Sequence, residues 1–502
     1  MSKLPTITLD TTLAELYETG ENPGSSDRIA MVLCATNSEI ELSAGLARNT
    51  KYLYQDSIFS NGSEHLSPRD YDELQHHSAV KYLSLVPQRD AFASGNMGVI
   101  LFTLDDSKEQ TIHSREEAEK TMARLSPAQR PRLLFFRGPE DISLKKHGID
   151  LLAPKLGLDG LEAFPLTLDL ETHYFLNSKG ALFASGLPTP QGQLIELGSV
   201  CPDAQSCCGS CASNVDSLSI PSSCTGIRKP WLSSQISHII SRISAQPVPF
   251  VFKNQQTFGG GGTFLVSSQE DRIKLNHKLS THVLPKLLSQ VTPANAHLQP
   301  ATLLLTSLVA NPIGDYGLTF FVTRTGECVF ISLSEQKLDS SKAWIGSKIS
   351  YLAQDALQLR FDKIMRDIGA WLHRHNYYGP VGADILETAP IDGEKSSDNF
   401  HIVDLNVRTS GSLVLGLLRG HFSKRRGLHE ASSFSVTMKM KREEFVERLA
   451  EDLEEGRVVV ISWYEDGASG LSYANVVVGA EDTKRLEREI ERVKQFAEEI
   501  TF

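Results

Sequence analysis

The feature that most constrains this chain is a pair of apolar segments that carry acidic side chains. Asp384 interrupts the first segment. In the second, residues 402–408, Asp404, Asn406 and Arg408 alternate with apolar residues. Because successive side chains of a strand point to opposite faces, these three share one face, and Asp384 on a neighbouring strand would face the same space. Buried carboxylates require a cationic partner or a metal ion.

The predicted site contains only oxygen ligands, from Asp384, Asp404 and Asn406. Two carboxylates and one amide oxygen suit Mg²⁺ that bridges nucleotide phosphates, with Mn²⁺ as an alternative, and do not suit Zn²⁺. Arg408 beside them would carry the positive charge that a transferring phosphoryl group needs. The alternative is a strand with a solvated polar face, and the apolar residues that flank Asp404 argue against it.

A second candidate for phosphate binding is a lysine followed by a glycine loop. Lys253 ends the apolar residues 250–252. Four consecutive glycines follow it: Gly259, Gly260, Gly261 and Gly262. The backbone of such a loop can approach phosphates because no Cβ is in the way. The alternative is a flexible linker, and the loop is not a Walker loop because no Gly-Lys-Ser/Thr follows.

Together these segments resemble the ATP-grasp superfamily. Residues 177–179, followed by residues 181–190, resemble its first lysine, helix and Gly-x-Pro-x-Pro turn, and Lys253 resembles its second lysine. The resemblance covers about residues 166–422. Within the superfamily it points to poorly characterised ATP-grasp proteins of filamentous fungi.

The resemblance implies how the phosphates and the metal are bound. Lys179 and Lys253 would hold the α- and β-phosphates of ATP, and the glycine loop would close as a lid. The metal would be bound by the three oxygen ligands, with Asp404 in place of the glutamate that is usual there. Arg408 and Lys253 would be the catalytic residues, because phosphoryl transfer needs positioning and charge neutralisation.

The resemblance also implies where the nucleoside binds. The strand around residues 303–308 resembles the one whose backbone holds adenine, which assigns that role to Thr306, Ser307 and Leu308. Asp315 lies where an acidic residue often binds ribose. These residues would complete the nucleotide site.

The resemblance implies a mixed α/β and α+β architecture, the ATP-grasp fold, in which two α+β lobes sandwich ATP. An N-terminal α/β domain would occupy residues 1–165. The first lobe would span residues 166–310, with a cysteine-rich insertion at 199–226. The second lobe, with the metal site, would span residues 311–440, and a helix–β–helix extension would occupy residues 441–502.

Four short apolar segments predict a parallel sheet in the N-terminal domain. They are residues 29–34, 82–86, 99–104 and 133–136. Their spacing by tens of residues is typical of strands connected by helices.

The implied function is an ATP-dependent carboxylate–amine ligase. A carboxylate would attack the γ-phosphate of ATP to give an acylphosphate, and an amine would displace phosphate. The substrates would be an amino acid or small metabolites of specialised metabolism. A kinase or a carboxylate–thiol ligase on the same lobes, and a nucleotide-binding protein without turnover, remain alternatives.

The seven cysteines are unevenly distributed, with five between Cys201 and Cys224. The spacing of Cys208 and Cys211 is typical of zinc ligands, but no second Cys-x-x-Cys and no nearby histidine accompany it. Two interpretations stay open, a metal site and a mobile loop. The segment lengthens the sequence between Lys179 and Lys253 and therefore predicts an insertion on the nucleotide-binding lobe.

Charge and hydrophobicity restrict the partners. The net charge of −11 argues against nucleic acid or an acidic membrane surface as the main partner. No apolar segment approaches the roughly 20 residues of a membrane span, and residues 1–22 do not resemble a secretory signal. We expect a cytoplasmic enzyme with small-molecule substrates, whose C-terminal region packs on the core or supports a homodimer.

Overall fold

The computed structural model describes residues 4–19, 28–35, 46–56, 67–104, 107–215, 218–258, 261–338, 344–390 and 399–496. Gly259 and Gly260 of the predicted glycine loop lie outside these residues. Among the described residues, no helix combines the length and the hydrophobicity that a membrane span requires. The expected mixed architecture is confirmed, since one parallel and two antiparallel sheets are present with helices packed on them.

The N-terminal unit contains a parallel sheet in the order β3-β2-β1-β4. Its strands are β1 (Ile29–Val32), β2 (Gly98–Phe102), β3 (Arg132–Phe136) and β4 (Leu151–Pro154). β1 and β2 are buried along their whole length, as expected for parallel strands covered on both faces. Three of the four predicted strands are therefore confirmed.

The prediction of a strand at residues 82–86 is wrong. This segment belongs to one continuous helical stretch made of α3 (Pro68–Val80), the π-helical turn η1 (Lys81–Leu85) and α4 (Val86–Ala91). Tyr82 and Leu83 are buried in the core on one side of the parallel sheet. A short buried apolar segment has the same sequence pattern in a helix as in a strand, which explains the error. The fourth strand, β4, comes from a segment that was not among those predicted.

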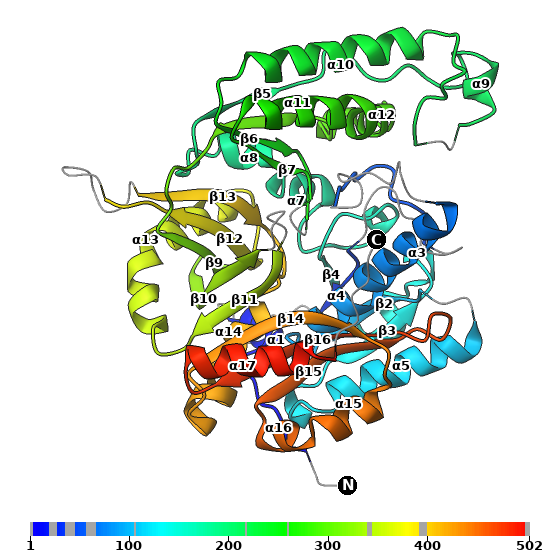
Figure 1. Cartoon of the computed structure of the whole chain (residues 1–502). Helices are drawn as coiled ribbons and strands as arrows, with labels where there is room; N and C mark the ends of the chain where they lie inside the picture. The colour runs from blue at the N-terminus through cyan, green and yellow to red at the C-terminus, as the bar shows by residue number, and fades with distance from the viewer. Residues whose placement is uncertain are drawn as a thin grey trace.

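The first lobe is built on an antiparallel sheet in the order β5-β8-β6-β7. Its strands are β5 (Gly192–Ile195), β6 (Phe250–Asn254), β7 (Thr263–Val266) and β8 (Leu303–Ser307). Its core joins β6 and β8 to three helices. These are α10 (Arg228–Ala245), α11 (Gln269–Lys278) and α12 (Leu284–Ser289), and Figure 1 shows α10 lying over the other two.

The second lobe and the C-terminal region share one antiparallel sheet of eight strands, in the order β13-β12-β9-β10-β11-β14-β16-β15. The strands are β9 (Gly314–Val322), β10 (Cys328–Leu338), β11 (Trp344–Ser350), β12 (Gly379–Glu387), β13 (Phe400–Asn406), β14 (Glu430–Met438), β15 (Val458–Glu465) and β16 (Ser472–Ala480). The sheet thus runs across the predicted boundary at residue 440.

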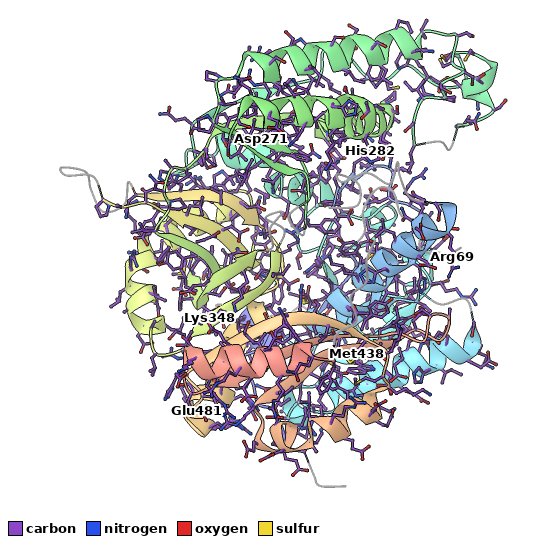
Figure 2. All side chains as sticks on the ribbon, viewed as in Figure 1. Arg69, Asp271, His282, Lys348, Met438 and Glu481 are labelled. Atoms are coloured by element: carbon purple, nitrogen blue, oxygen red, sulfur yellow. The ribbon has the colours of Figure 1, made fainter. Side chains whose placement is uncertain are left out.

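Two long helices pack on this sheet. The apolar face of α13 (Gln354–His373), with Phe361 and Ile368, packs on β9 and β10. α17 (Thr483–Lys494) packs on β14 and β16. Figure 2 shows Lys348 and Met438 on this sheet, well separated from Asp271 and His282 of the first lobe.

Other helices connect these layers. They are α1 (Leu13–Glu18), α5 (Lys108–Met122), α6 (Leu144–His147), α7 (Leu170–Leu176), α8 (Lys179–Ala184), α9 (Gly209–Ala212), α14 (Leu413–Leu417), α15 (Arg442–Arg448) and α16 (Ala450–Glu455). Single turns of π- or 3-10 helix add to them.

The N-terminal unit and the C-terminal strands are packed together. α5 lies against β15. The Arg442 guanidinium bonds Glu117 at 3.1 Å and donates to the Thr121 hydroxyl at 2.9 Å. The Glu117 side chain is 1% exposed, so this ion pair is buried in the contact.

Candidate active site

Two buried lysines of the first lobe meet the edge strand of the second. Lys179 is the first residue of α8, whose start is capped by Ser178, and Lys253 lies on β6. The Lys179 ammonium donates to an Asp404 carboxylate oxygen, and the Lys253 ammonium donates to the Val403 carbonyl. Both lysines are buried. The structure therefore brings together two of the predicted cations and one of the predicted carboxylates.

The predicted metal ligands lie on adjacent strands. Asp384 on β12 is directly paired with Asp404 on β13, and Gly382 is paired with Asn406. Burial, together with the charges of Asp404 and Asp315, raises the pKa of Asp384 to about 7. Burial would also raise the pKa of Asp404, but the charges of Lys179 and Lys253 outweigh it and lower that pKa.

These side chains fit a magnesium ion by their chemistry. Two adjacent carboxylates that repel each other gain most from a divalent cation between them. Asn406 is half-buried at the end of the same strand as Asp404 and adds an amide oxygen. The donor set contains oxygen only, as hard cations prefer. The side-chain amide of Gln336 on β10 donates a hydrogen bond to Asp384.

Arg408 follows β13 and turns toward the N-terminal unit. Its guanidinium bonds the Asn177 side-chain oxygen at 3.4 Å, and the same oxygen accepts the Val407 N–H at 3.0 Å. Burial lowers the pKa of Arg408, while the charge of Asp404 acts in the opposite direction. Asn177 lies two residues before Lys179. Its hydrogen bonds therefore fix the segment that carries Arg408 relative to Lys179.

A cavity of about 690 Å³ opens between the two lobes beside these charges. The first lobe lines it with residues 188–191 and 307–310, and the second lobe with residues 311, 388–389 and 400–401. Ser307 and Leu308, predicted to bind adenine, are therefore on its wall.

A small pocket of about 10 Å³ lies next to this cavity. It is lined by Thr306, Lys179 and Lys253, and it shares Thr189 and Pro190 with the larger cavity. The cavity and the two cations are therefore next to each other.

Asp315 and Gly262, which were also predicted to bind the nucleotide, lie at different places in the structure. Asp315 on β9 is paired with Leu386 and lies close enough to Asp384 to raise its pKa. Gly262 has a left-handed φ of +69°, and a Cβ there would lie 2.7 Å from the Asn254 amide nitrogen. Its carbonyl accepts the Asn254 N–H at 2.9 Å, so this part of the glycine loop is fixed against β6.

A second cluster of charges was missed by the sequence interpretation. Lys155 follows β4 and is 4% exposed at its side chain. It forms an ion pair with Asp90 of α4 and donates to the carbonyl and the hydroxyl of Thr409, each at 2.9 Å. Burial lowers the pKa of Lys155 to about 8. A usable signal existed, because ligands gather where parallel strands end.

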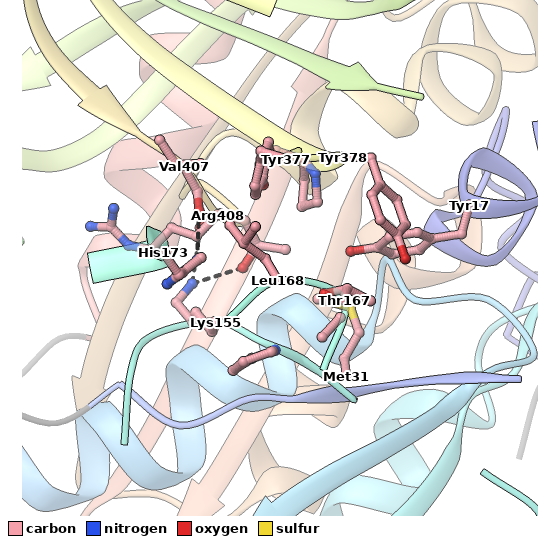
Figure 3. A pocket seen from close by; sticks show the side chains of 14 residues that line it. Tyr17, Met31, Lys155, Thr167, Leu168, His173, Tyr377, Tyr378, Val407 and Arg408 are labelled. Atoms are coloured by element: carbon pink, nitrogen blue, oxygen red, sulfur yellow. Dashed lines mark hydrogen bonds between the residues drawn. The ribbon is translucent and has the colours of Figure 1, made fainter. Parts of the chain in front are cut away.

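Lys155 and Arg408 line one small pocket of about 20 Å³ between the N-terminal unit and the second lobe (Figure 3). Tyr17, Tyr377 and His173 also line it. Burial lowers the pKa of His173 to about 4, so its ring is neutral, and its Nε2 lies 3.0 Å from the Val407 carbonyl. Tyr378 lines the pocket as well, which therefore presents two basic side chains and three phenol rings.

Comparisons with known proteins yield only distant structural similarity. No family model matches the sequence, and no curated protein matches it. Similar solved structures include N5-carboxyaminoimidazole ribonucleotide synthetase from Thermus thermophilus, which is 13% identical with a TM-score of 0.45 and aligns over 81% of this chain and 93% of that chain.

Two further similar structures contain nucleotides. Carboxyaminoimidazole ribonucleotide synthase from Aspergillus clavatus, in complex with ATP, is 11% identical with a TM-score of 0.46, over 94% of this chain and 98% of that chain. The biotin carboxylase domain of 2-oxoglutarate carboxylase from Hydrogenobacter thermophilus, with MgADP, ADP and bicarbonate, is 9% identical with a TM-score of 0.47, over 94% and 91%. At this level of similarity, function has to be argued from the site itself.

Proposed function

We propose that this chain is an ATP- and Mg²⁺-dependent ligase of the ATP-grasp type, which activates a carboxylate as an acylphosphate and joins it to an amine. One observation carries the proposal. Lys179 and Lys253 of the first lobe meet Asp384 and Asp404 of the second lobe beside a cavity of nucleoside size.

The nucleotide would lie along this arrangement. Its base would occupy the cavity beside Ser307 and Leu308, with the phosphates at Lys179 and Lys253. Asp384, Asp404 and Asn406 would hold Mg²⁺, which neutralises phosphate charge when it is bound. The lysines would lose their present contacts with Asp404 and the Val403 carbonyl and donate to phosphate oxygens instead.

In the proposed reaction, a carboxylate oxygen attacks the γ-phosphorus, and the bond to the bridging oxygen of ADP breaks. An amine then attacks the acyl carbon, loses a proton and releases inorganic phosphate. Arg408 is positioned by Asn177 to stabilise the negative charge on the substrate carboxylate and on the transferred group.

The carboxylate substrate would enter from the N-terminal unit. Arg408 also lines the pocket that contains Lys155 and Tyr377. Lys155 is already paired with Asp90, so Arg408 supplies the positive charge that favours an anionic substrate in this pocket. We propose a small acid, such as an amino acid or a metabolite of specialised metabolism, as the carboxylate substrate, and its binding would require this pocket of about 20 Å³ to widen.

The decisive experiment is ADP release on mixing the protein with Mg·ATP and pools of carboxylates, with and without amines. ADP release that depends on an acid, with phosphate release that also requires an amine, is the expected result. A stable phosphorylated product would identify a kinase, and a requirement for a thiol would identify a carboxylate–thiol ligase. Measurable ATP binding without ADP release in any pool would overturn the proposal in favour of a binding protein.

A further inference from the structure

Four cysteine sulfurs form a compact cluster in the segment that precedes α10. The Sγ atoms of Cys207, Cys208, Cys211 and Cys224 all lie within 4.8 Å of one another. The Cys207–Cys224 separation is 3.7 Å, and the Cys208–Cys224 separation is 3.9 Å. Cys207 and Cys208 directly precede α9, Cys211 lies within it, and Cys224 comes from the loop before α10.

These separations match zinc coordination. A Zn–S bond is about 2.3 Å, so the sulfurs of a tetrahedral tetrathiolate lie about 3.8 Å apart. A disulfide would instead require an S–S bond of about 2.05 Å. All seven cysteines are free thiols.

We propose that Cys207, Cys208, Cys211 and Cys224 bind one Zn²⁺ ion as a structural site. Four sulfurs fill the tetrahedral shell and leave no open position for a substrate, which is the pattern of structural zinc. The four thiols release their protons to solvent as they bind the metal. The sequence left a metal site open among the five clustered cysteines but did not single out these four, because Cys224 belongs to no Cys-x-x-Cys pair.

The backbone around the cluster approaches the sulfurs closely and donates hydrogen bonds to them. Gly226 passes so close to Cys207 that a Cβ there would lie 2.5 Å from its Sγ atom, a distance that no side chain tolerates. The Arg228 N–H donates to the Cys207 Sγ at 3.4 Å. Backbone N–H groups of Cys211 and Thr225 bond the Cys208 sulfur. Such N–H···S bonds orient metal thiolates and stabilise their charge.

Nearby cations would balance the charge of the site. Zinc with four thiolates carries a net charge of about −2. Arg228 interacts with Cys211, and Lys229 follows it at the start of α10. The fifth cysteine of the segment, Cys201, is outside the tetrahedral set and lies 3.6 Å from the Arg228 guanidinium.

The metal would tie the inserted segment to the first lobe. Among the described residues between β5 and α10, α9 is the one short helix, so the inserted chain would otherwise have few constraints. Zinc would fix it to the beginning of α10, whose Ile239 and Ile243 pack on the sheet that carries Lys253. Figure 1 shows α9 beside one end of α10, far from β12 and β13, so the site is separate from the catalytic charges.

The test is the metal content of the full-length protein, purified without metal-affinity steps. Elemental analysis should find about one zinc ion per chain, and X-ray absorption should find four sulfur neighbours at about 2.3 Å. Cys211→Ser should lose at least 90% of the zinc, by analogy with closed structural sites that need all their ligands. Cys201→Ser, in the same segment, and Cys328→Ser on β10 are matched controls that should keep it.

Two outcomes would overturn the proposal. One is wild-type protein from zinc-replete medium that contains no zinc and fails to take up Co²⁺ with the visible absorption of a tetrahedral thiolate complex. The other is bound zinc with nitrogen or oxygen neighbours in X-ray absorption. Both measurements use the wild-type chain, so they decide the question even if Cys211→Ser does not fold.

Discussion

Asp384 and Asp404 lie directly opposite each other on β12 and β13, yet their pKa values move in opposite directions. Of the two carboxylates, Asp404 is the one that bonds Lys179. The charges of Lys179 and Lys253 keep Asp404 ionised. Asp384 has an amide neighbour, Gln336, and a pKa of about 7. Asp404 is thus charged before any metal arrives, whereas Asp384 is only partly ionised near neutral pH and would ionise further when a cation binds.

Removing the charge of Asp404 tests the metal assignment. Asp404→Asn keeps the size of the side chain but removes a ligand and leaves Lys179 without its anion. We expect ADP release to fall by at least about 100-fold, the scale of losing a preorganised charge. The far-UV circular dichroism spectrum should be unchanged. Asp355→Asn, at an 80% exposed side chain on α13, is the control and should keep full activity. Normal turnover by folded Asp404→Asn would refute the assignment.

The pKa of Lys253 predicts a pH dependence of ATP binding. Burial lowers this pKa to about 8 in the nucleotide-free protein. Phosphates favour the charged amine, so binding above pH 8 takes up a proton, and ATP affinity should fall by up to about tenfold per pH unit there. Lys253→Arg stays charged and should flatten this decline. Calorimetric titrations of both proteins with ATP between pH 7 and about 9.5 would measure this decline in affinity. Equal pH slopes for both proteins would exclude Lys253 as the titrating group.

Filling the cavity tests where the base binds. Ala389 lines the cavity and is exposed, so its replacement by tryptophan adds volume without disturbing a core. We expect Ala389→Trp to weaken ATP binding by about 10- to 100-fold, which corresponds to about 1.4–2.7 kcal/mol. Ala389→Ser is the matched control with unchanged affinity. Equal ATP affinities of the two variants would show that the base binds at another site.

The ion pair of Lys155 and Asp90 should matter for stability. Their side chains are 4% and 1% exposed. Asp90→Ala leaves a buried ammonium next to Arg89 and should lower the free energy of unfolding by about 3–5 kcal/mol. Asp367→Ala breaks an exposed pair with Lys363 and should cost less than about 1 kcal/mol. Urea denaturation measures the free energy of unfolding of both variants. Similar losses would show that the buried pair stabilises the fold no more than the exposed pair does.

The sequence was informative where chemistry depends on local pattern. Alternation within apolar strands was enough to predict that Asp384 and Asp404 share a face. The lysine cluster was different, because Lys155 is 65 positions from Asp90 and 254 from Thr409. Only the packing of the N-terminal unit on the second lobe brings them together. The roles assigned to the site residues remain predictions, and so do the domain boundaries.

The contact between Glu117 and Arg442 has a consequence for how the protein is made. These residues are 325 positions apart, so at about 5–20 residues per second the ribosome synthesises α5 roughly 20 to 60 s before its partner. During that interval the inward face of α5 and the Glu117 carboxylate have no covering strand. We expect ribosome-bound chains that end before residue 442 to be cleaved by protease near α5, and chains that include β15 and β16 to resist. The newborn N-terminal unit would then depend on chaperones until the C-terminal strands emerge.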